Sequence, residues 1–117
     1  MNGKPFILHM VSEGTGQTLE AMSRACAPHF PGTQFDIRHW NLIRTQGQLQ
    51  RVMEAIVAEP GLVLSSLIDR DLEHALEDGC KKIGVNVHDI MTPTLQLLER
   101  ETGEHASGRP GSQYVMD

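Results

Sequence analysis

Short apolar segments alternate along the chain with segments whose apolar residues recur at the spacing of one helical face. Four apolar runs predict strands, at residues 6–11, 35–42, 62–68 and 85–90. The segments that follow them repeat their apolar residues three and four positions apart, as helices packed on a sheet do. This alternation predicts an α/β fold with a parallel sheet and helices on both faces.

The helical stripes identify the residues expected to face the sheet. They are Leu19, Met22, Ser23 and Cys26 in the first helix, Leu49, Val52, Met53, Ile56 and Val57 in the second, and Leu72, Ala75, Leu76, Gly79, Cys80 and Ile83 in the third. Gly84 is expected to end the third helix. A last helix is expected to begin at Thr92-Pro93, with Thr92 as its N-cap, and to end near Gly103.

The predicted strands differ in how they should be buried. The runs at 6–11 and 62–68 are mostly apolar, as strands covered on both faces are, whereas 35–42 alternates apolar and polar residues like an edge strand. Right-handed crossovers then favour the spatial order 2-1-3-4, a Rossmann-like or flavodoxin-like arrangement. In such a sheet the ligand crevice lies at the carboxyl ends of strands 1 and 3.

Length and composition fit one domain. The chain has 117 residues, of which 39% are hydrophobic, enough for one core. We assign residues 1–103 to the α/β domain. Residues 104–117 are rich in Gly, Ser and Pro without an apolar period, so we expect an extended arm or a linker to a further domain.

The net charge, the first apolar run and the cysteines argue against several classes of protein. A formal net charge of -5 without a run of basic residues argues against a nucleic-acid partner. The first apolar run is too short for a signal peptide or a membrane span, so we expect a cytoplasmic protein with no membrane partner. Cys26 and Cys80 lie in helical stripes and are expected to be buried thiols, not a disulfide.

The loop after the first strand is the best candidate for binding chemistry. It reads Ser12-Glu13-Gly14-Thr15-Gly16-Gln17-Thr18 and leads into a helix, so its backbone N–H groups and the helix dipole should face the crevice. Two glycines allow a ligand to approach the backbone, and three hydroxyls add donors, which favours a phosphate-bearing ligand. The alternative is a turn capped by Thr15 or Thr18 that binds nothing.

Two further segments should reach the same edge of the sheet. Arg44-Thr45 follows the second strand and Asp69-Arg70 follows the third. Arginine matches phosphate or carboxylate, and Asp69 could hold a ribose hydroxyl, a metal or Arg44. The alternative is that Thr45 and Asp69 only cap the helices that they precede.

Metal and catalytic signals are weak. The six histidines are scattered, with no i, i+4 pair and no cysteine cluster nearby, so we predict no metal site. His9 and His88 are expected to be satisfied core or crevice histidines. The sequence contains no G-x-x-x-x-G-K-[ST] phosphate loop and no G-x-S-x-G elbow, and we assign no catalytic residue.

Residues 6–20, FILHMVSEGTGQTLE, resemble the start of the pyruvate phosphate dikinase and phosphoenolpyruvate synthase regulatory proteins, which typically read S-D-S-T-G-E-T after the first strand. Further landmarks of the resemblance follow in order: Arg44-Thr45 with Gly47-Gln48-Leu49, residues 61–64 and 76–80, Asp89 with Pro93, and Arg109-Pro110-Gly111. The resemblance covers almost the whole chain.

The resemblance implies the N-terminal domain of a bifunctional enzyme. Family members use ADP to phosphorylate a threonine of the dikinase or the synthase, and use phosphate to remove it with release of pyrophosphate. Their phosphate loop lies in a C-terminal domain, expected after Arg109-Pro110-Gly111, so the resemblance implies a truncated or stand-alone regulatory domain that is inactive alone.

Such a domain would serve nucleotide or effector sensing, target recognition or dimerisation. The resemblance implies a homodimer whose partner is one of the two target enzymes. It implies no cofactor for this chain, with ADP or phosphate as ligands of the full-length enzyme.

The loop departs from the family pattern. Glu13 stands where Asp is usual, Gly14 where Ser is usual and Gln17 where Glu is usual, while Tyr114 replaces a frequent His. The changes at Gly14 and Gln17 remove a hydroxyl and a carboxylate that could engage nucleotide or magnesium.

Two other functions remain open from the residues. Thr15-Gly16-Gln17-Thr18 looks like part of a flavodoxin phosphate loop, which would make the chain a stand-alone phosphate- or nucleotide-binding module, although Glu13 would face the flavin phosphate. A receiver-like domain would use Asp69 as phosphoacceptor, but only Glu13 could help it to hold magnesium.

Overall fold

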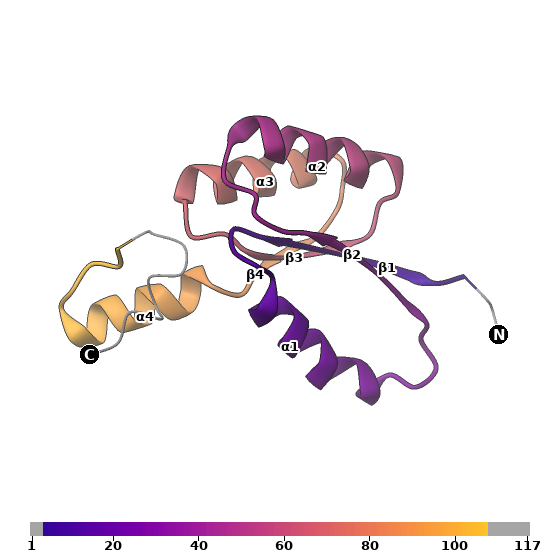
Figure 1. Cartoon of the computed structure of the whole chain (residues 1–117), viewed down its shortest axis with the longest axis horizontal. Helices are drawn as coiled ribbons and strands as arrows, with labels where there is room; N and C mark the ends of the chain where they lie inside the picture. Colours follow the sequence, from indigo (N-terminus) through magenta and orange to yellow (C-terminus); the bar gives the residue numbers. More distant parts are fainter. Residues whose placement is uncertain (1–3, 108–117) are drawn as a thin grey trace.

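The computed structural model describes residues 4–107 and contains one sheet of four parallel strands (Figure 1). The strands are β1 (Phe6–Ser12), β2 (Phe35–Trp40), β3 (Leu62–Ser66) and β4 (Val87–Asp89). Their order is β2-β1-β3-β4, which confirms the predicted order 2-1-3-4 and the edge position of the second strand. All three neighbouring pairs are parallel, so every strand ends at the same edge of the sheet.

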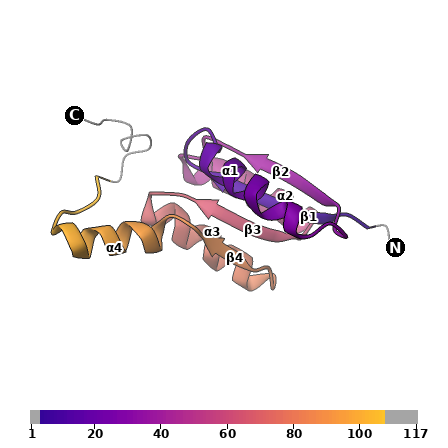
Figure 2. The same ribbon diagram turned by 90° about the horizontal axis from the view of Figure 1, so that it is seen from below.

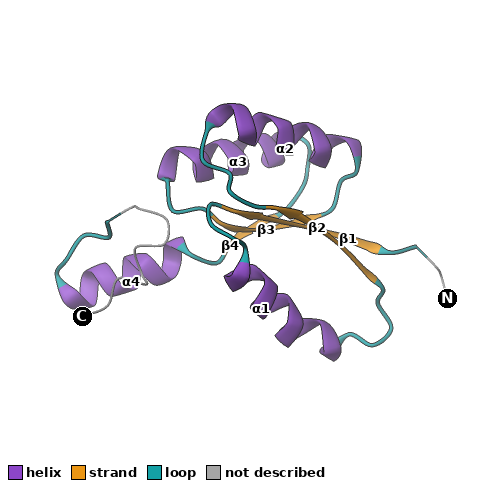
Figure 3. Cartoon of the chain, viewed as in Figure 1, coloured by secondary structure: helices purple, strands orange, loops and turns teal. Residues whose placement is uncertain are grey.

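The helices cover the two faces unequally. They are α1 (Gln17–Cys26), α2 (Gln46–Ala58), α3 (Arg70–Lys82) and α4 (Thr92–Thr102), with a short 3₁₀ turn, η1 (Ala27–His29), after α1. Helices α2 and α3 lie on one face and α1 on the other (Figures 1 and 3). Helix α4 leaves the carboxyl end of β4 and extends beyond the sheet (Figure 2), and none of its residues is buried.

Two clusters of buried side chains correspond to these two layers. The larger lies under α2 and α3 and contains Val11, Ile43, Leu49, Val52, Ile56, Val63, Leu67, Leu72, Leu76 and Cys80. The smaller lies under α1 and contains Leu8, Met10 and Leu19. The face covered by one helix therefore contributes less apolar burial, which is the main favourable term in folding.

Some residues at the borders of the predicted stripes are exposed, contrary to the sequence-based expectation. Met22 is 39% exposed, Val57 55% and Ile83 40%. Cys26 is also exposed because it is the last residue of α1, where the chain turns away from the sheet. The other cysteine, Cys80, is fully buried in the larger core as expected, and both thiols are free.

The predicted helix ends are correct at two glycines and wrong at one cap. Gly84 and Gly103 adopt left-handed φ angles of +75° and +79° just beyond α3 and α4. Thr92 is not the N-cap of α4; Met91 holds that position. The carboxylate of Asp89 provides the cap instead, because its Oδ1 accepts from the N–H groups of Met91 and Thr92 at 2.9 and 3.0 Å.

Strands β2, β3 and β4 are shorter than predicted. The terminal residues of the predicted strands lie in turns or form hydrogen bonds with side chains. β2 stops at Trp40, since Leu42 has a left-handed φ of +60°. β3 stops before Ile68, whose N–H bonds a side chain and not a neighbouring strand. Of the predicted arm, residues 104–107 have no regular secondary structure, and 108–117 lie outside the described residues.

Candidate functional site

The three segments singled out from the sequence meet at the carboxyl edge of the sheet. The loop after β1 receives backbone hydrogen bonds from the segment after β2: Leu42 N–H donates to the Gly14 carbonyl at 2.9 Å, and Ile43 N–H to the Ser12 carbonyl at 3.0 Å. The Arg44 side chain continues this contact, with its Nε donating to the Glu13 carbonyl at 3.0 Å. The segment after β3 is joined through the side chain of Glu13.

Glu13 is the centre of this arrangement. Its side chain lies at the switch point between β1 and β3, and the residue is only 4% exposed. Oε1 accepts from the backbone N–H groups of Ile68 and Asp69 at 2.5 and 2.7 Å, immediately before α3. The protein's own carboxylate therefore occupies the place beside α3 where backbone amides favour an anion. No sequence pattern predicted this role for Glu13.

Two further features order the loop backbone: the contact between Ser12 and Asn41, and the glycine at position 16. The Ser12 hydroxyl lies 3.0 Å from Asn41 Oδ1 and 3.1 Å from the Gly14 carbonyl oxygen, both of which can accept its proton. Gly16 has a φ of +86°, and a Cβ there would lie 2.4 Å from Asn41 Oδ1. Glycine is therefore required at this position for both conformation and space.

The N-terminus of α1 has no side-chain cap. Gly16 stands at the N-cap position and has no hydroxyl or carboxylate to offer, and neither Thr15 nor Thr18 bonds an amide of the helix. The expected capping of this turn by Thr15 or Thr18 is therefore wrong. Thr15, Gln17 and Thr18 are exposed at this helix end.

Two of the predicted binding residues act as caps. Thr45 forms a capping box with Gln48 at the start of α2, each side chain accepting from the other's backbone. Asp69 Oδ1 accepts from Asp71 and Leu72 N–H at the start of α3. Within residues 4–107 no ion pair joins Asp69 to Arg44, which is an exposed residue.

A second buried glutamate lies one strand further along the same edge. Glu73, in the first turn of α3, is 2% exposed, and its Oε1 accepts from the Ser65 hydroxyl at 2.8 Å. Its carboxylate, that of Glu77 and that of Asp89 each place an oxygen within 4.8 Å of the others. Loss of hydration raises the pKa of Glu73 to about 9, and the carboxyl groups of Glu77 and Asp89 act in the same direction.

His9 is a satisfied core histidine, as predicted. It is fully buried, its Nδ1 accepts from Trp40 Nε1 at 3.0 Å, and its Nε2 lies 2.8 Å from the Glu59 carbonyl oxygen. Because Trp40 can only donate, the ring proton belongs on Nε2. The other strand histidine, His88, is exposed on β4 and belongs to neither core, contrary to expectation.

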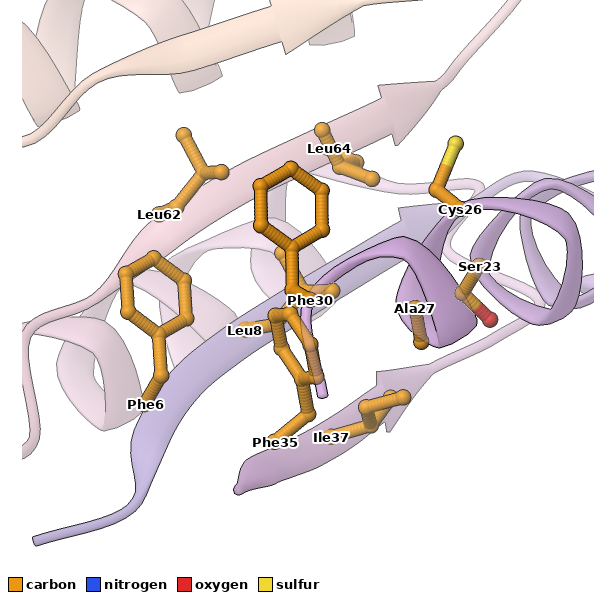
Figure 4. A pocket seen from close by; sticks show the side chains of 10 residues that line it. All are labelled: Phe6, Leu8, Ser23, Cys26, Ala27, Phe30, Phe35, Ile37, Leu62 and Leu64. Carbon is orange, nitrogen blue, oxygen red and sulfur yellow. The ribbon is translucent and has the colours of Figure 1, made fainter. Parts of the chain in front are cut away.

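An apolar pocket opens near the opposite end of β1 (Figure 4). It has a volume of about 140 Å³ and lies between the sheet and α1. Three aromatic rings shape it, with the Phe35 centroid 5.7 Å from that of Phe6 and 6.5 Å from that of Phe30. No charged residue lines this pocket, so it offers nothing to a phosphate.

Comparison with known proteins gives a consistent result. A family described as kinase/pyrophosphorylase matches residues 8–117. Curated relatives bear the name "Putative pyruvate, phosphate dikinase regulatory protein". One from Acidiphilium cryptum is 43% identical over 117 residues, covering 100% of this chain and 40% of the relative. One from Paramagnetospirillum magneticum is 38% identical over 114 residues, covering 97% of this chain and 37% of the relative. The chain thus spans about two fifths of the length of such relatives.

Proposed function

The chain belongs to the kinase/pyrophosphorylase family, and from this premise we propose that it is the N-terminal α/β domain of a pyruvate, phosphate dikinase regulatory protein. The observation that carries the proposal is the similarity over residues 8–117 to relatives that bear this name. The partner is then pyruvate, phosphate dikinase, in the cytoplasm, and the working form is a homodimer.

The whole protein would phosphorylate a threonine of the dikinase with ADP and remove that phosphate with inorganic phosphate. The 117 residues supply no phosphate loop for either reaction, so the chemistry would belong to a further domain. We therefore expect the chain alone to bind the dikinase without transferring phosphate.

The contribution of this domain would be to sense a phosphate-bearing ligand at the loop after β1. Uncapped helix amides at the start of α1 attract anions, and Thr15 and Thr18 stand exposed beside them. Arg44 is tied to the same loop through its Nε and is exposed, so its terminal nitrogens can reach a ligand. Glu13 orders the loop from behind, with its carboxylate directed at α3.

Two assays test the proposal separately. The first mixes the purified chain with the dikinase of the same organism; we expect a complex and no phosphothreonine on the dikinase, whichever of ATP and ADP is supplied. Failure to bind the dikinase would remove the proposed partner. Phosphothreonine would show that the chain is catalytically complete.

The second assay follows amide resonances while phosphate or ADP is added. We expect the amide resonances of Gly14, Thr15 and Gly16 to shift, and we expect added salt to weaken the binding. Arg44→Ala should weaken binding by about 1–3 kcal/mol, the range for loss of a charge-assisted contact. Arg51→Ala, at an exposed position on α2, is the matched control and should leave binding unchanged. Shifts confined to other regions would contradict a phosphate site in this loop.

A further inference from the structure

The carboxylate cluster formed by Glu73, Glu77 and Asp89 is not used by the function proposed above. It joins two successive turns of α3 to the carboxyl end of β4. The three residues differ in burial: Glu73 is buried, Asp89 is half-buried and Glu77 is exposed. The cluster therefore has a closed inner side and one side open to solvent.

The inner side contains a polar atom with no partner. Glu73 Oε2 is buried and accepts no hydrogen bond from residues 4–107, although Oε1 accepts from Ser65. A buried polar atom without a partner is costly, and native structures usually supply one. No lysine, arginine or histidine within residues 4–107 forms an ion pair with any of the three carboxylates. Among the described residues only the carboxyl of Glu77 lies in position to share a proton with Glu73, and a bound cation would serve the same carboxylates in place of that proton.

We propose that Glu73, Glu77 and Asp89 bind one divalent cation, Ca²⁺ or Mg²⁺. Carboxylate oxygens are the ligands that such hard cations prefer. Ca²⁺ binds oxygen at about 2.3–2.6 Å, so oxygens on opposite sides of it lie about 4.6–5.2 Å apart. The three side-chain oxygens all lie within 4.8 Å of one another, so they are close enough to share one ion. Mg²⁺, with bonds of about 2.0–2.1 Å, needs its oxygens closer together than Ca²⁺ does. Water completes the shell from the exposed side of Glu77.

A cation here would fix the point from which α4 departs. Asp89 Oδ1 already accepts from Met91 and Thr92 N–H at the start of α4, which leaves Oδ2 for the cation. Helix α4 has no buried residue to anchor it otherwise. Cation binding would thus tie the start of α4 to α3 through Asp89 and Glu73.

The test is a titration of the purified chain, stripped of metal, with Ca²⁺ and Mg²⁺ separately. Isothermal titration calorimetry should give saturable binding of one ion per chain. Amide resonances of Met91 and Thr92 should shift with the same saturation, and their hydrogen exchange should slow. No saturable binding of either ion up to about 10 mM, beyond the range of weak protein sites, would overturn the proposal.

Three isosteric substitutions locate the ion. Glu73→Gln, Glu77→Gln and Asp89→Asn each remove one charge and keep an oxygen, so each should weaken binding about tenfold or more. Asp78→Asn is the matched control, since Asp78 neighbours Glu77 on α3 but pairs with Lys82; its binding should stay within about twofold of the unmodified chain.

Glu77→Gln, at an exposed position, keeps the test informative if a buried variant fails to fold. If the Glu73 and Asp89 variants bind the ion as well as the unmodified chain does, the ion lies elsewhere and the assignment is wrong. Binding lost equally in Asp78→Asn would show general attraction to an acidic helix, and would also overturn it.

Discussion

Two buried glutamates at the same edge of the sheet have opposite surroundings. Glu13, after β1, is 4% exposed, and Glu73, at the start of α3, is 2% exposed. Glu13 directs one oxygen at two backbone N–H groups, those of Ile68 and Asp69. Glu73 has one hydroxyl donor, Ser65, one oxygen without a partner, and two other carboxyl groups close by.

The comparison shows that burial alone does not decide what a carboxyl group contributes. At Glu13, peptide donors replace the lost water, and the side chain links β1 to α3 as a structural element. At Glu73, dehydration on burial, helped by the neighbouring carboxyl groups, raises the pKa to about 9, so the side chain takes up a proton or, as proposed, shares a cation. Glu13 orders the candidate phosphate loop, whereas Glu73 favours binding of a proton or a cation.

The largest expected effect is loss of stability when Glu13 is truncated. Glu13→Ala leaves the N–H groups of Ile68 and Asp69 without their acceptor, so we expect the free energy of unfolding to fall by roughly 3 kcal/mol or more. Glu13→Gln keeps an acceptor oxygen and should lose less. Urea unfolding measures both.

Glu54→Ala provides the control for this prediction. Glu54 lies exposed on α2, and its truncation should change the free energy of unfolding by no more than about 0.5 kcal/mol. A Glu13→Ala protein as stable as Glu54→Ala would show that the link between β1 and α3 is dispensable.

The contribution of Glu73 to stability should depend on pH. Its folded-state pKa of about 9 lies above the ordinary value of 4.5, so the folded chain holds a proton that the unfolded chain releases between these values. Stability from this group is therefore complete below about pH 4.5 and is lost as pH rises toward 9. Glu73→Gln cannot ionise and should escape this loss.

The measurement is urea unfolding of both proteins from pH 5 to pH 8 with a chelator present. The advantage of Glu73→Gln should grow by about 1 kcal/mol per pH unit, near the limit for one proton. A constant difference across this range would mean that Glu73 ionises normally in the folded chain.

Part of this fold could be predicted from the spacing of residues along the sequence. The sheet order and the central residues of the stripes on α1, α2 and α3 follow from apolar spacing, because burial on a sheet imposes that spacing. Thr45 and Asp69 were recognisable as possible caps because a cap bonds residues two or three positions ahead. Thr92 is not the cap because it is already the first residue of α4, and the Asp89 carboxylate, three residues earlier, accepts from the N–H groups of Met91 and Thr92.

The two glutamates depend on contacts between distant segments. Nothing near Glu13 in the sequence shows that Ile68 and Asp69 will face it, so its role needed the folded chain. Glu73 did leave a signal, because it falls three and seven positions before Leu76 and Cys80 on the apolar stripe of α3. A charged residue on a buried stripe indicates a special partner, but only the fold brings Asp89 to it.

A smaller effect is expected at Asp89, where one residue serves two purposes. Asp89→Asn keeps an acceptor for Met91 and Thr92 but removes a negative charge near Glu73, so the pKa of Glu73 should fall. Asp89→Ala removes the cap as well, at about 1 kcal/mol. Carboxyl ¹³C titration and hydrogen exchange in α4 measure the two effects, and exchange in α4 that stays unchanged with Asp89→Ala would contradict the capping role.

The smallest expected effects come from removing the serine hydroxyl beside each glutamate, that of Ser65 beside Glu73 and that of Ser12 beside Glu13. Ser65→Ala removes the hydroxyl that donates to Glu73 Oε1, so about 1 kcal/mol of stability should be lost and the pKa of Glu73 should rise further, because the Ser65 hydroxyl acts to lower it. Ser12→Ala is the matched change beside Glu13: it removes a buried hydroxyl that contacts Asn41 and the Gly14 carbonyl. It should lose similar stability without moving the titration of Glu73. Carboxyl ¹³C titration of both variants decides the point, since an equal shift in both would mean that the two regions are electrostatically coupled and not independent.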